Sequence, residues 1–380
     1  MNQQVYLDNA ATTKIADAVK AEMEPYLKEN YGNASTSYSI GTEAKWAIEK
    51  AREIIAGTLR AKPSEIYFTS GGSESDNWAI KGVAGDNKKK GRHIITSSIE
   101  HHAVLNSCEY LEQLGYQVTY LKPDGKGMIS PEAVLDALQP DTTLITIMYG
   151  NNEVGTVEPI MQIGKIAREH GIIFHTDAVQ AYAQVPLSVM HLPVDLLSAS
   201  SHKFHGPKGV GFLYVREGVN VPSFIHGGGQ ERGKRAGTEN VAGIVGMGKA
   251  AELAHINMRV RIQKEIMLRN YMIERVLHEI PNARLNGHSS MRLPGNMNFS
   301  FKGIEGASLL MLLEEDGICA SGGSACNTGG NRISYVIEEL GVPKEYAPGT
   351  VRFTMCGDTT KEEIDVAIES LKRNVARLTL

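Results

Sequence analysis

The sequence predicts an α/β fold: a mostly parallel sheet covered by helices, followed by a smaller α+β domain. Short β-branched, apolar runs alternate with amphipathic segments from about residue 66 to residue 176, which is the pattern of βαβ units. After about residue 280 the pattern changes, and hydrophobic and polar positions alternate. The length of 380 residues also favours two domains rather than one.

The elements of the larger domain follow from periodicity. Helices are expected over about 14–29 and 41–60, from apolar residues at three- and four-residue spacing. Strands are expected at 66–69, 93–96, 118–121, 144–148, 172–176, 194–199 and 209–215. Further helices are expected to begin near residues 71, 103, 130 and 159. Because parallel sheets bind ligands at the carboxyl ends of their strands, a site is expected in the loops that follow them.

The C-terminal part begins with a long helical pattern from Thr238 to about Ile280. It continues with a half-exposed strand at 297–301, a helix at about 305–316, a loop rich in glycine and serine at 320–331, a strand at 351–354 and a final helix. Thr359 and Glu362 fit a capping box for that last helix. We therefore predict a large domain over 14–259 and a small domain formed by 1–13 and 260–380.

The composition is that of an ordinary globular protein, with 42% hydrophobic and 22% charged residues. A formal net charge of −4 predicts no broad basic surface for nucleic acid. No apolar run approaches the roughly 18 residues of a membrane helix, and the first residues lack the features of a signal peptide. The four cysteines form no disulfide framework, so we expect reduced thiols and a cytoplasmic location.

Lys203 lies in a polar loop between two expected strands. Its amine can form an imine with a carbonyl compound, although a solvated surface lysine is the simple alternative. Asp177 ends the preceding strand of the sheet, with Gln180 three residues later, and taken alone Asp177 could cap a turn. A lysine and a carboxylate arranged in this way suit pyridoxal phosphate (PLP), because the lysine forms the imine and the carboxylate keeps the ring nitrogen protonated.

Two glycine-containing segments are candidate phosphate sites. Gly71-Gly72-Ser73 follows a strand and opens a helix, where backbone N–H groups favour an anion, although an ordinary βα turn has the same composition. It is not the GxGxxG pattern of dinucleotide-binding proteins. The segment from Gly228 to Lys234 satisfies GxxxxGK, but Arg235 stands where a P-loop needs Ser or Thr. We therefore expect no nucleoside triphosphate site.

Three more features suggest chemistry. His101 and His102 are adjacent but have no third metal ligand at a recognisable spacing, so we expect stacking on a cofactor or acid–base work rather than a metal site. Cys326 stands in the Gly/Ser-rich loop, which suggests an exposed thiol that travels to a substrate; an incidental surface thiol is the alternative. Arg352 offers a planar fork for a carboxylate, or else forms a surface salt bridge.

Assembled in this order, the motifs resemble those of cysteine desulfurases of the NifS/IscS type, in the class V aminotransferase branch of the fold type I PLP enzymes. The resemblance covers nearly the whole chain. It rests on Tyr6-Leu7-Asp8-Asn9-Ala10-Ala11-Thr12-Thr13, Thr69-Ser70-Gly71-Gly72-Ser73-Glu74-Ser75, Glu100-His101-His102-Ala103-Val104, Asn151-Asn152-Glu153-Val154-Gly155, Asp177-Ala178-Val179-Gln180, Ser200-Ser201-His202-Lys203, Arg235-Ala236-Gly237-Thr238, Gly323-Ser324-Ala325-Cys326 and Val351-Arg352-Phe353.

The resemblance implies a role for each matching residue. Catalysis is implied for Lys203 as the imine-forming lysine, His101 as the residue that stacks on the ring and moves protons, and Cys326 as the nucleophile that accepts sulfur. Cofactor binding is implied for Gly72, Ser73, Asp177, Gln180, Ser200 and His202, and for Thr238 toward the phosphate of a neighbouring subunit. Asn152 and Arg352 are implied to hold the substrate carboxylate.

The implied activity converts L-cysteine to L-alanine and passes the sulfur, as a persulfide on Cys326, to an acceptor protein such as an iron–sulfur scaffold. A homodimer with shared active sites is also implied. Selenocysteine lysis or transamination on the same scaffold, and a cofactor-free docking protein, are the alternatives. Two segments depart from the family pattern: Asn33-Ala34-Ser35-Thr36 with Tyr38 in place of a histidine, and Gly330-Asn331-Arg332-Ile333 after Cys326.

Overall fold

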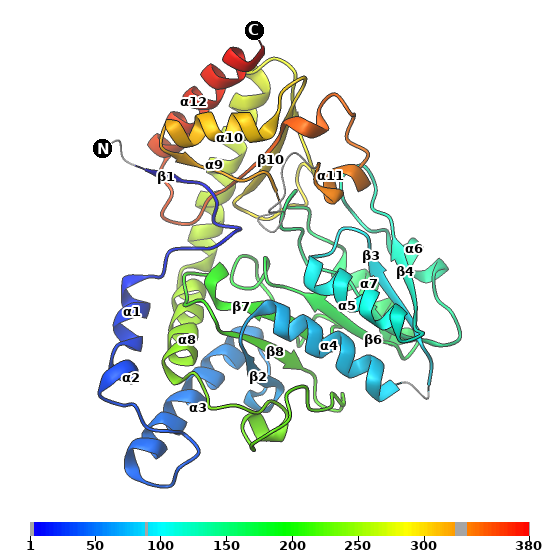
Figure 1. Cartoon of the computed structure of the whole chain (residues 1–380), viewed down its shortest axis with the longest axis vertical. Coiled ribbons are helices and arrows are strands. Elements are labelled where there is room, and N and C mark those ends of the chain that lie inside the picture. The colour runs from blue at the N-terminus through cyan, green and yellow to red at the C-terminus, as the bar shows by residue number, and fades with distance from the viewer. Residues whose placement is uncertain (1–3, 88–89, 324–332, 380) are drawn as a thin grey trace.

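The computed structural model describes residues 4–87, 90–323 and 333–379 (Figure 1). Its strands are β1 Val5–Tyr6, β2 Ile66–Thr69, β3 His93–Ser97, β4 Gln117–Leu121, β5 Thr142–Thr146, β6 Ile173–Asp177, β7 Leu196–Ser200, β8 Gly211–Val215, β9 Ala283–Leu285, β10 Asn296–Phe301, β11 Ile318–Cys319 and β12 Thr350–Thr354. Its α-helices are α1 Asp17–Met23, α2 Pro25–Lys28, α3 Ser39–Leu59, α4 Gly72–Asn87, α5 His102–Gln113, α6 Pro131–Asp136, α7 Ile160–Glu169, α8 Val241–Ile256, α9 Met258–Glu279, α10 Gly306–Glu315, α11 Tyr335–Glu339 and α12 Lys361–Thr379.

The large sheet has the strand order β2-β8-β7-β6-β5-β3-β4. The strands from β7 through β4 run parallel, and β8 is antiparallel to both of its neighbours. Successive residues of these strands point to opposite faces, as the pleat requires. In β5, for example, Ile145 packs in the cluster that includes α3, α7 and α8, whereas Leu144 packs with α4 and α5. The predicted α/β architecture with a mostly parallel, doubly covered sheet is therefore confirmed.

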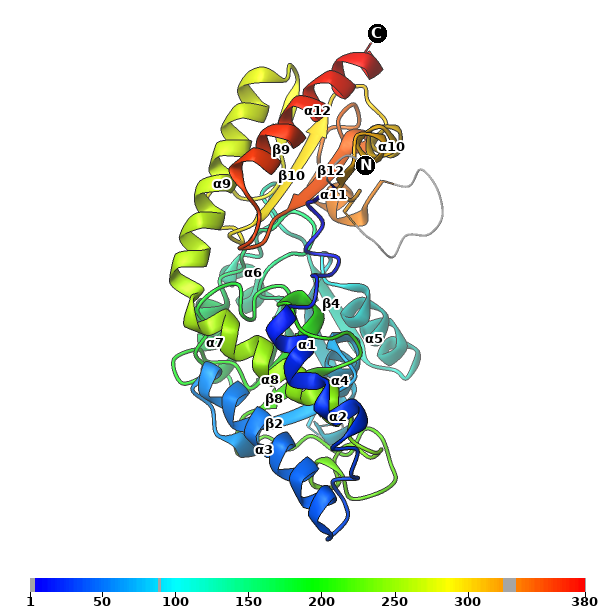
Figure 2. The same ribbon diagram turned by 90° about the vertical axis from the view of Figure 1, so that its left-hand side faces the viewer.

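A second core lies around the antiparallel sheet β12-β10-β9. It includes Phe299 and Phe353 from the sheet together with residues of α9, α10 and α12. Val5 and Leu7 belong to the same cluster, because β1 pairs in parallel with β11. Figure 2 shows the helices α8 and α9 running one after the other along one side, from the large sheet to this second core. The separate clusters support the domain division at 14–259, which stays a prediction.

Two details of the C-terminal part differ from expectation. The strand β10, predicted to be half-exposed, is buried along its whole length. Its polar side chains tolerate burial because they are hydrogen-bonded: Asn286 Nδ2 donates to Asn298 Oδ1 at 2.8 Å and to Ser300 Oγ at 2.7 Å. The alternation in the sequence therefore reflects a polar layer inside the protein rather than an exposed face.

The second difference concerns the start of α12. The predicted capping box of Thr359 with Glu362 is wrong by one residue, because Thr360 and Glu363 form it: the Thr360 N–H donates to Glu363 Oε2 at 2.9 Å, and the Glu363 N–H to Thr360 Oγ1 at 3.2 Å. The Thr359 hydroxyl instead accepts a hydrogen bond from the Cys356 N–H at 3.1 Å. Within the ranges that the structure describes, every helix is too short or too polar to cross a bilayer.

Candidate active site

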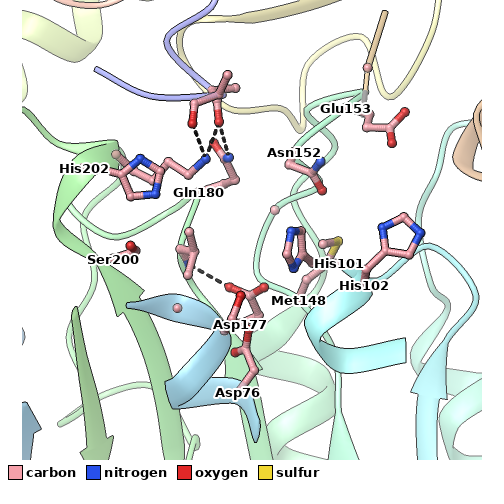
Figure 3. Close-up of a pocket in the computed structure, with 18 of the residues that line it drawn as sticks. Asp76, His101, His102, Met148, Asn152, Glu153, Asp177, Gln180, Ser200 and His202 are labelled. Carbon is pink, nitrogen blue, oxygen red and sulfur yellow. Dashed lines mark hydrogen bonds between the residues drawn. The ribbon is translucent and has the colours of Figure 1, made fainter. Parts of the chain in front are cut away.

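A cavity of about 290 Å³ lies where the carboxyl ends of β5, β6 and β7 meet the N-terminus of α4 (Figure 3). This is the edge of the sheet at which parallel strands bind ligands. The structure brings many of the residues singled out in the sequence into its lining: Gly72, Ser73, His101, Asn152, Asp177, Gln180, Ser200, His202, Lys203 and Arg352. These residues come from segments between residues 72 and 352, so only the fold brings them together.

Lys203 reaches the cavity from a short 3₁₀ turn, Ser201–Lys203, that follows β7 directly. Its ammonium donates hydrogen bonds to the backbone carbonyls of Ala10 at 2.5 Å and Ala11 at 2.9 Å. Gln180 Nε2 donates to the same Ala10 carbonyl at 2.9 Å. The segment after β1 therefore covers the lysine, and its carbonyls hold the amine in place.

Asp177 is the last residue of β6, and its side chain is buried. Its Oδ1 accepts a hydrogen bond from the Val179 N–H at 2.8 Å. Burial raises the pKa of Asp177, while positive charge on His101 and on Lys203 lowers it. A cationic nitrogen placed against this carboxylate would favour its charged form in the same way.

The opposite end of the cavity is suited to an anion. Gly71 has a φ of +151°, a conformation that side chains rarely adopt, and α4 begins at the next residue. A Cβ added at Gly72 would lie 2.5 Å from Val179 Cγ2, so a larger residue here would require the Val179 side chain to shift. The hydroxyls of Ser73 and Ser200 stand beside the N-terminus of this 16-residue helix, whose free N–H groups attract phosphate.

His202 lines the same end. Its Nδ1 lies 3.1 Å from Thr12 Oγ1, and burial lowers its pKa to about 4. A neutral imidazole leaves one ring N–H that can donate to a phosphate oxygen.

Arg352 is buried, at 2% exposure, rather than part of a surface salt bridge. Its Nη1 donates to the carbonyls of Asn152 at 2.7 Å and Gly323 at 2.8 Å, and its Nη2 donates to Asp8 Oδ1 at 2.7 Å. Among the described residues, Arg352 Nε and Asn152 Oδ1 are buried without a hydrogen-bond partner. A guanidinium fixed by three contacts and still offering a donor can recognise a small carboxylate.

His101 is the N-cap of α5, and its Nδ1 accepts a hydrogen bond from the Ala103 N–H at 3.1 Å. This assigns the remaining proton of the neutral ring to Nε2. Burial lowers the pKa of His101, which favours that neutral form. The His102 ring instead packs edge-on against Tyr335, with ring centroids 5.0 Å apart. The two adjacent histidines therefore have different surroundings, and both line the cavity.

Two of the predicted residues are not placed in this cavity. Thr238 is exposed in the loop just before α8, so its predicted role toward a neighbouring subunit stays a prediction. Cys326 lies outside the described residues. The GxxxxGK segment is not a strand–loop–helix unit: it contains a 3₁₀ turn at Glu231–Gly233, and Arg235 beyond it forms an ion pair with Glu74 at 2.8 Å.

Sequence reasoning missed several acidic residues of the site. Asp76 and Glu153 line the cavity, and Asp8 binds Arg352. A signal was present for Asp76, which shares the buried face of α4 with Ala79 and Ile80. A carboxyl group at a position where the helical pattern requires an apolar residue indicates a buried polar role.

Comparison with known proteins shows the family of the chain. Residues 5–366 match the family model described as "Aminotransferase class-V". The chain belongs to the class-V aminotransferase family. Within this family, its relatives include the cysteine desulfurase IscS of Dictyoglomus turgidum, 51% identical over 100% of this chain and 96% of that protein. The enzyme of the same name from Methanosarcina thermophila is 52% identical over 99% of this chain and 93% of that protein.

Solved structures of similar proteins share the fold. A NifS-like protein superposes with a TM-score of 0.93 at 38% identity, over 99% of this chain and 100% of that one. A structure of SspA in complex with cysteine gives a TM-score of 0.82 at 39% identity, over 94% of this chain and 100% of that one. The resemblance to NifS/IscS-type proteins and the fold type I architecture are thereby confirmed.

The cofactor of class-V aminotransferases is PLP, and the donors in the cavity fit it. The amine of Lys203, the carboxylate of Asp177 and the anion site at the start of α4 are the three kinds of group that an aldehyde, a pyridine nitrogen and a phosphate require.

Glu100 gives a stability prediction. This carboxyl is buried, accepts hydrogen bonds from Ser97 Oγ at 2.6 Å and the Met148 N–H at 2.9 Å, and burial raises its pKa to about 8. The native state therefore keeps a proton that the unfolded chain releases, and the wild type loses stability as pH rises from about 4.5 toward 8. Gln at this position does not titrate.

We expect the difference in free energy of unfolding, apo Glu100→Gln minus apo wild type, to increase with pH. The increase should be up to about 1.4 kcal/mol per pH unit between pH 5 and pH 8, and urea titrations measure it. Glu109→Gln, an exposed position of α5, is the control and should keep a constant difference. A constant difference for Glu100→Gln as well would show that Glu100 is ionised in the native protein.

Proposed function

We propose that the chain is a PLP-dependent cysteine desulfurase, which converts L-cysteine to L-alanine and transfers the sulfur to an acceptor. The observation that carries this proposal is the single cavity that combines Lys203, Asp177 and Arg352 in a chain about half identical to named cysteine desulfurases. The relative solved in complex with cysteine supports cysteine as the substrate. We propose a protein of iron–sulfur cluster assembly as the sulfur acceptor, because the relatives are named cysteine desulfurase IscS.

PLP, when bound, supplies an electron-accepting ring that makes the α-proton of an amino acid acidic. Lys203 would link to it and, once exchanged for the substrate amine, would take the α-proton. Asp177 would pair with the ring nitrogen, and Gln180 would lie beside the ring hydroxyl. Ser73, Ser200, His202 and the backbone at Gly72 would hold the phosphate.

The substrate is held at its carboxylate. Arg352 and Asn152 offer the donors there, and Arg352 cannot turn away because Asp8 and two carbonyls already fix it. His101 Nε2 is the ring nitrogen that can transfer a proton, because Nδ1 accepts the hydrogen bond from the Ala103 N–H. The site therefore orients the Cα–H bond and supplies a base and a second proton carrier.

Sulfur transfer uses the thiolate of Cys326. An S–S bond forms between Cys326 and the substrate sulfur as the substrate C–S bond breaks, the carbon keeps that electron pair, and it takes up a proton to give alanine. L-cysteine and a thiol thus become alanine and a persulfide, and no external oxidant is needed. A homodimer completed by Thr238 of the partner, and a cytoplasmic location, belong to the same proposal on sequence grounds.

The test is alanine release from L-cysteine by protein loaded with PLP in the presence of a reductant, with Cys326→Ala measured in parallel. We expect alanine and sulfide from the wild type, and a loss of about 10²-fold or more in Cys326→Ala with the cofactor absorbance unchanged. Cys108→Ala is the matched control, since Cys108 is a buried thiol of α5 outside the cavity. Full desulfurase activity in Cys326→Ala would remove Cys326 from the mechanism.

A further inference from the structure

Three buried carboxyl groups gather at one wall of the cavity, and two of them, Asp76 and Asp177, line it. Asp76 comes from α4, Glu100 from the turn before α5, and Asp177 from the end of β6. Their exposures are 1%, 0% and 6%, respectively. Both Asp177 and Glu100 act electrostatically on Asp76, so the three are close enough to influence one another's ionisation. Three negative charges in one buried site repel strongly, so at most one of them is expected to stay ionised unless a cation joins them.

Asp177 is the member of this cluster that has a positive partner. It faces the cavity, where the positive charge on Lys203 and the hydrogen bond from the Val179 N–H favour its ionised form. Glu100 has two hydrogen-bond donors but no cation among the groups that act on it within the described chain. The single negative charge therefore belongs to Asp177, which is also the residue expected to meet the ring nitrogen of the cofactor.

Asp76 has no cation in its surroundings as the structure describes them. The nearest basic side chain is His175 of β6, whose Nε2 is 3.7 Å from Asp76 Oδ1. His175 is fully buried and is hydrogen-bonded through Nδ1 to Thr146 Oγ1 at 2.8 Å and through Nε2 to Ser198 Oγ at 3.0 Å. Burial lowers the pKa of His175 to about 3, so the ring is neutral. A side-chain hydrogen bond from Ser198 favours the ionised form of Asp76, but burial and the repulsion from Asp177 and Glu100 act against it, and burial is the largest of these effects.

The position of Asp76 allows a protonated carboxyl group to donate a hydrogen bond toward Asp177. Figure 3 shows the Asp76 side chain below that of Asp177, on the side away from Gln180 and Asn152. Asp76 Oδ1 is buried and has no hydrogen-bond partner among the described residues. A protonated carboxyl group in this place is a dipole that can turn its O–H toward the Asp177 carboxylate and stabilise the negative charge there.

We propose that Asp76 is a positioning residue that stays protonated in the working enzyme and directs its O–H at Asp177, so that Asp177 alone carries the charge offered to the cofactor ring. The inference rests on the proposed PLP chemistry and goes beyond it, because it assigns a neutral state and a supporting role to a second carboxyl group of the cavity lining. It also explains how two further acids can lie at the cavity without expelling an anionic cofactor.

The test compares wild type, Asp76→Asn and Asp76→Ala, each loaded with PLP and studied without cysteine. The readouts are the dissociation constant for PLP, the pH midpoint of the bound-cofactor absorbance, and thermal unfolding of the apo forms. Asn is neutral and keeps a donor, so we expect its PLP affinity within about twofold of the wild type and an unchanged midpoint. Ala removes the donor, so we expect about tenfold weaker PLP binding and a shifted midpoint, the effect of one lost hydrogen bond to a charged group.

A midpoint that falls by about one pH unit in Asp76→Asn would mean that a negative charge had been removed, and would overturn the inference. A folded Asp76→Ala protein with wild-type affinity and midpoint would overturn it as well. If Asp76→Ala does not fold, the Asp76→Asn titration still decides whether Asp76 is charged. A wild type that shows the cofactor absorbance but makes no alanine refutes only the desulfurase function, whereas a wild type that binds no PLP refutes both proposals.

Discussion

Lys203→Ala is expected to abolish alanine formation from L-cysteine, with a loss of about 10³-fold or more. The ammonium of Lys203 donates hydrogen bonds to the Ala10 and Ala11 carbonyls at the edge of the cavity. An amine from solvent would not be held in this position, so it cannot replace the lysine. Removing Lys203 takes away both the covalent link to PLP and the base for the α-proton. The absorbance of the lysine-linked cofactor should disappear together with the activity.

The control for this experiment is Lys165→Ala, which removes an exposed lysine on α7 and should leave activity and absorbance unchanged. The unfolding temperature of the apo proteins separates catalysis from folding. If Lys203→Ala kept the cofactor absorbance while unfolding normally, another amine would be the point of attachment, and the proposed chemistry would need a different lysine.

The second large effect is expected at Arg352. In Arg352→Lys the charge remains, but a single ammonium cannot keep the contacts to Asp8, Asn152 and Gly323 and also meet a substrate carboxylate. We expect kcat/KM for L-cysteine to fall by about 10²-fold, mainly through KM, which corresponds to about 3 kcal/mol for a charge-assisted fork. The PLP affinity should be unchanged, because Arg352 stands at the other end of the cavity from the α4 N-terminus.

Steady-state kinetics of Arg352→Lys against Arg377→Lys, an exposed residue of α12, measure this effect. A drop in kcat with an unchanged KM would contradict carboxylate binding by Arg352. Loss of stability is a separate expectation, since Asp8 is left with a poorer partner; urea titration of both variants reports it independently of substrate.

The sequence was sufficient for the parts of the molecule that local patterns determine. The continuous apolar strands and their following helices predicted the large sheet, and the end of β6 and the turn after β7 predicted that Asp177 and Lys203 share one site. The sequence was insufficient where a polar side chain is buried and its hydrogen-bond partner lies far away in the chain. Nothing near Asn298 in the chain shows that Asn286 will satisfy it inside the core. In the same way, no local pattern joins Asp8 to Arg352, which are 344 positions apart.

The buried carboxyl groups at the cavity also show what the sequence can and cannot predict. Asp76 breaks the apolar pattern of its helix, which local reading can detect, yet its neighbours Asp177 and Glu100 come from other elements. Whether such a carboxyl is charged depends on those neighbours, so its state follows only from the folded arrangement.

The pairing of β1 with β11 has a consequence for the order in which the protein matures during translation. Val5 and Tyr6 align with Ile318 and Cys319, so β1 has no pairing partner until more than three hundred further residues have been made. The Ala10 and Ala11 carbonyls that hold Lys203 follow that strand directly. The large sheet can form earlier from its own local units, but the segment that holds the lysine is anchored only after β11 has been made. A nascent chain therefore folds before it can become a catalyst.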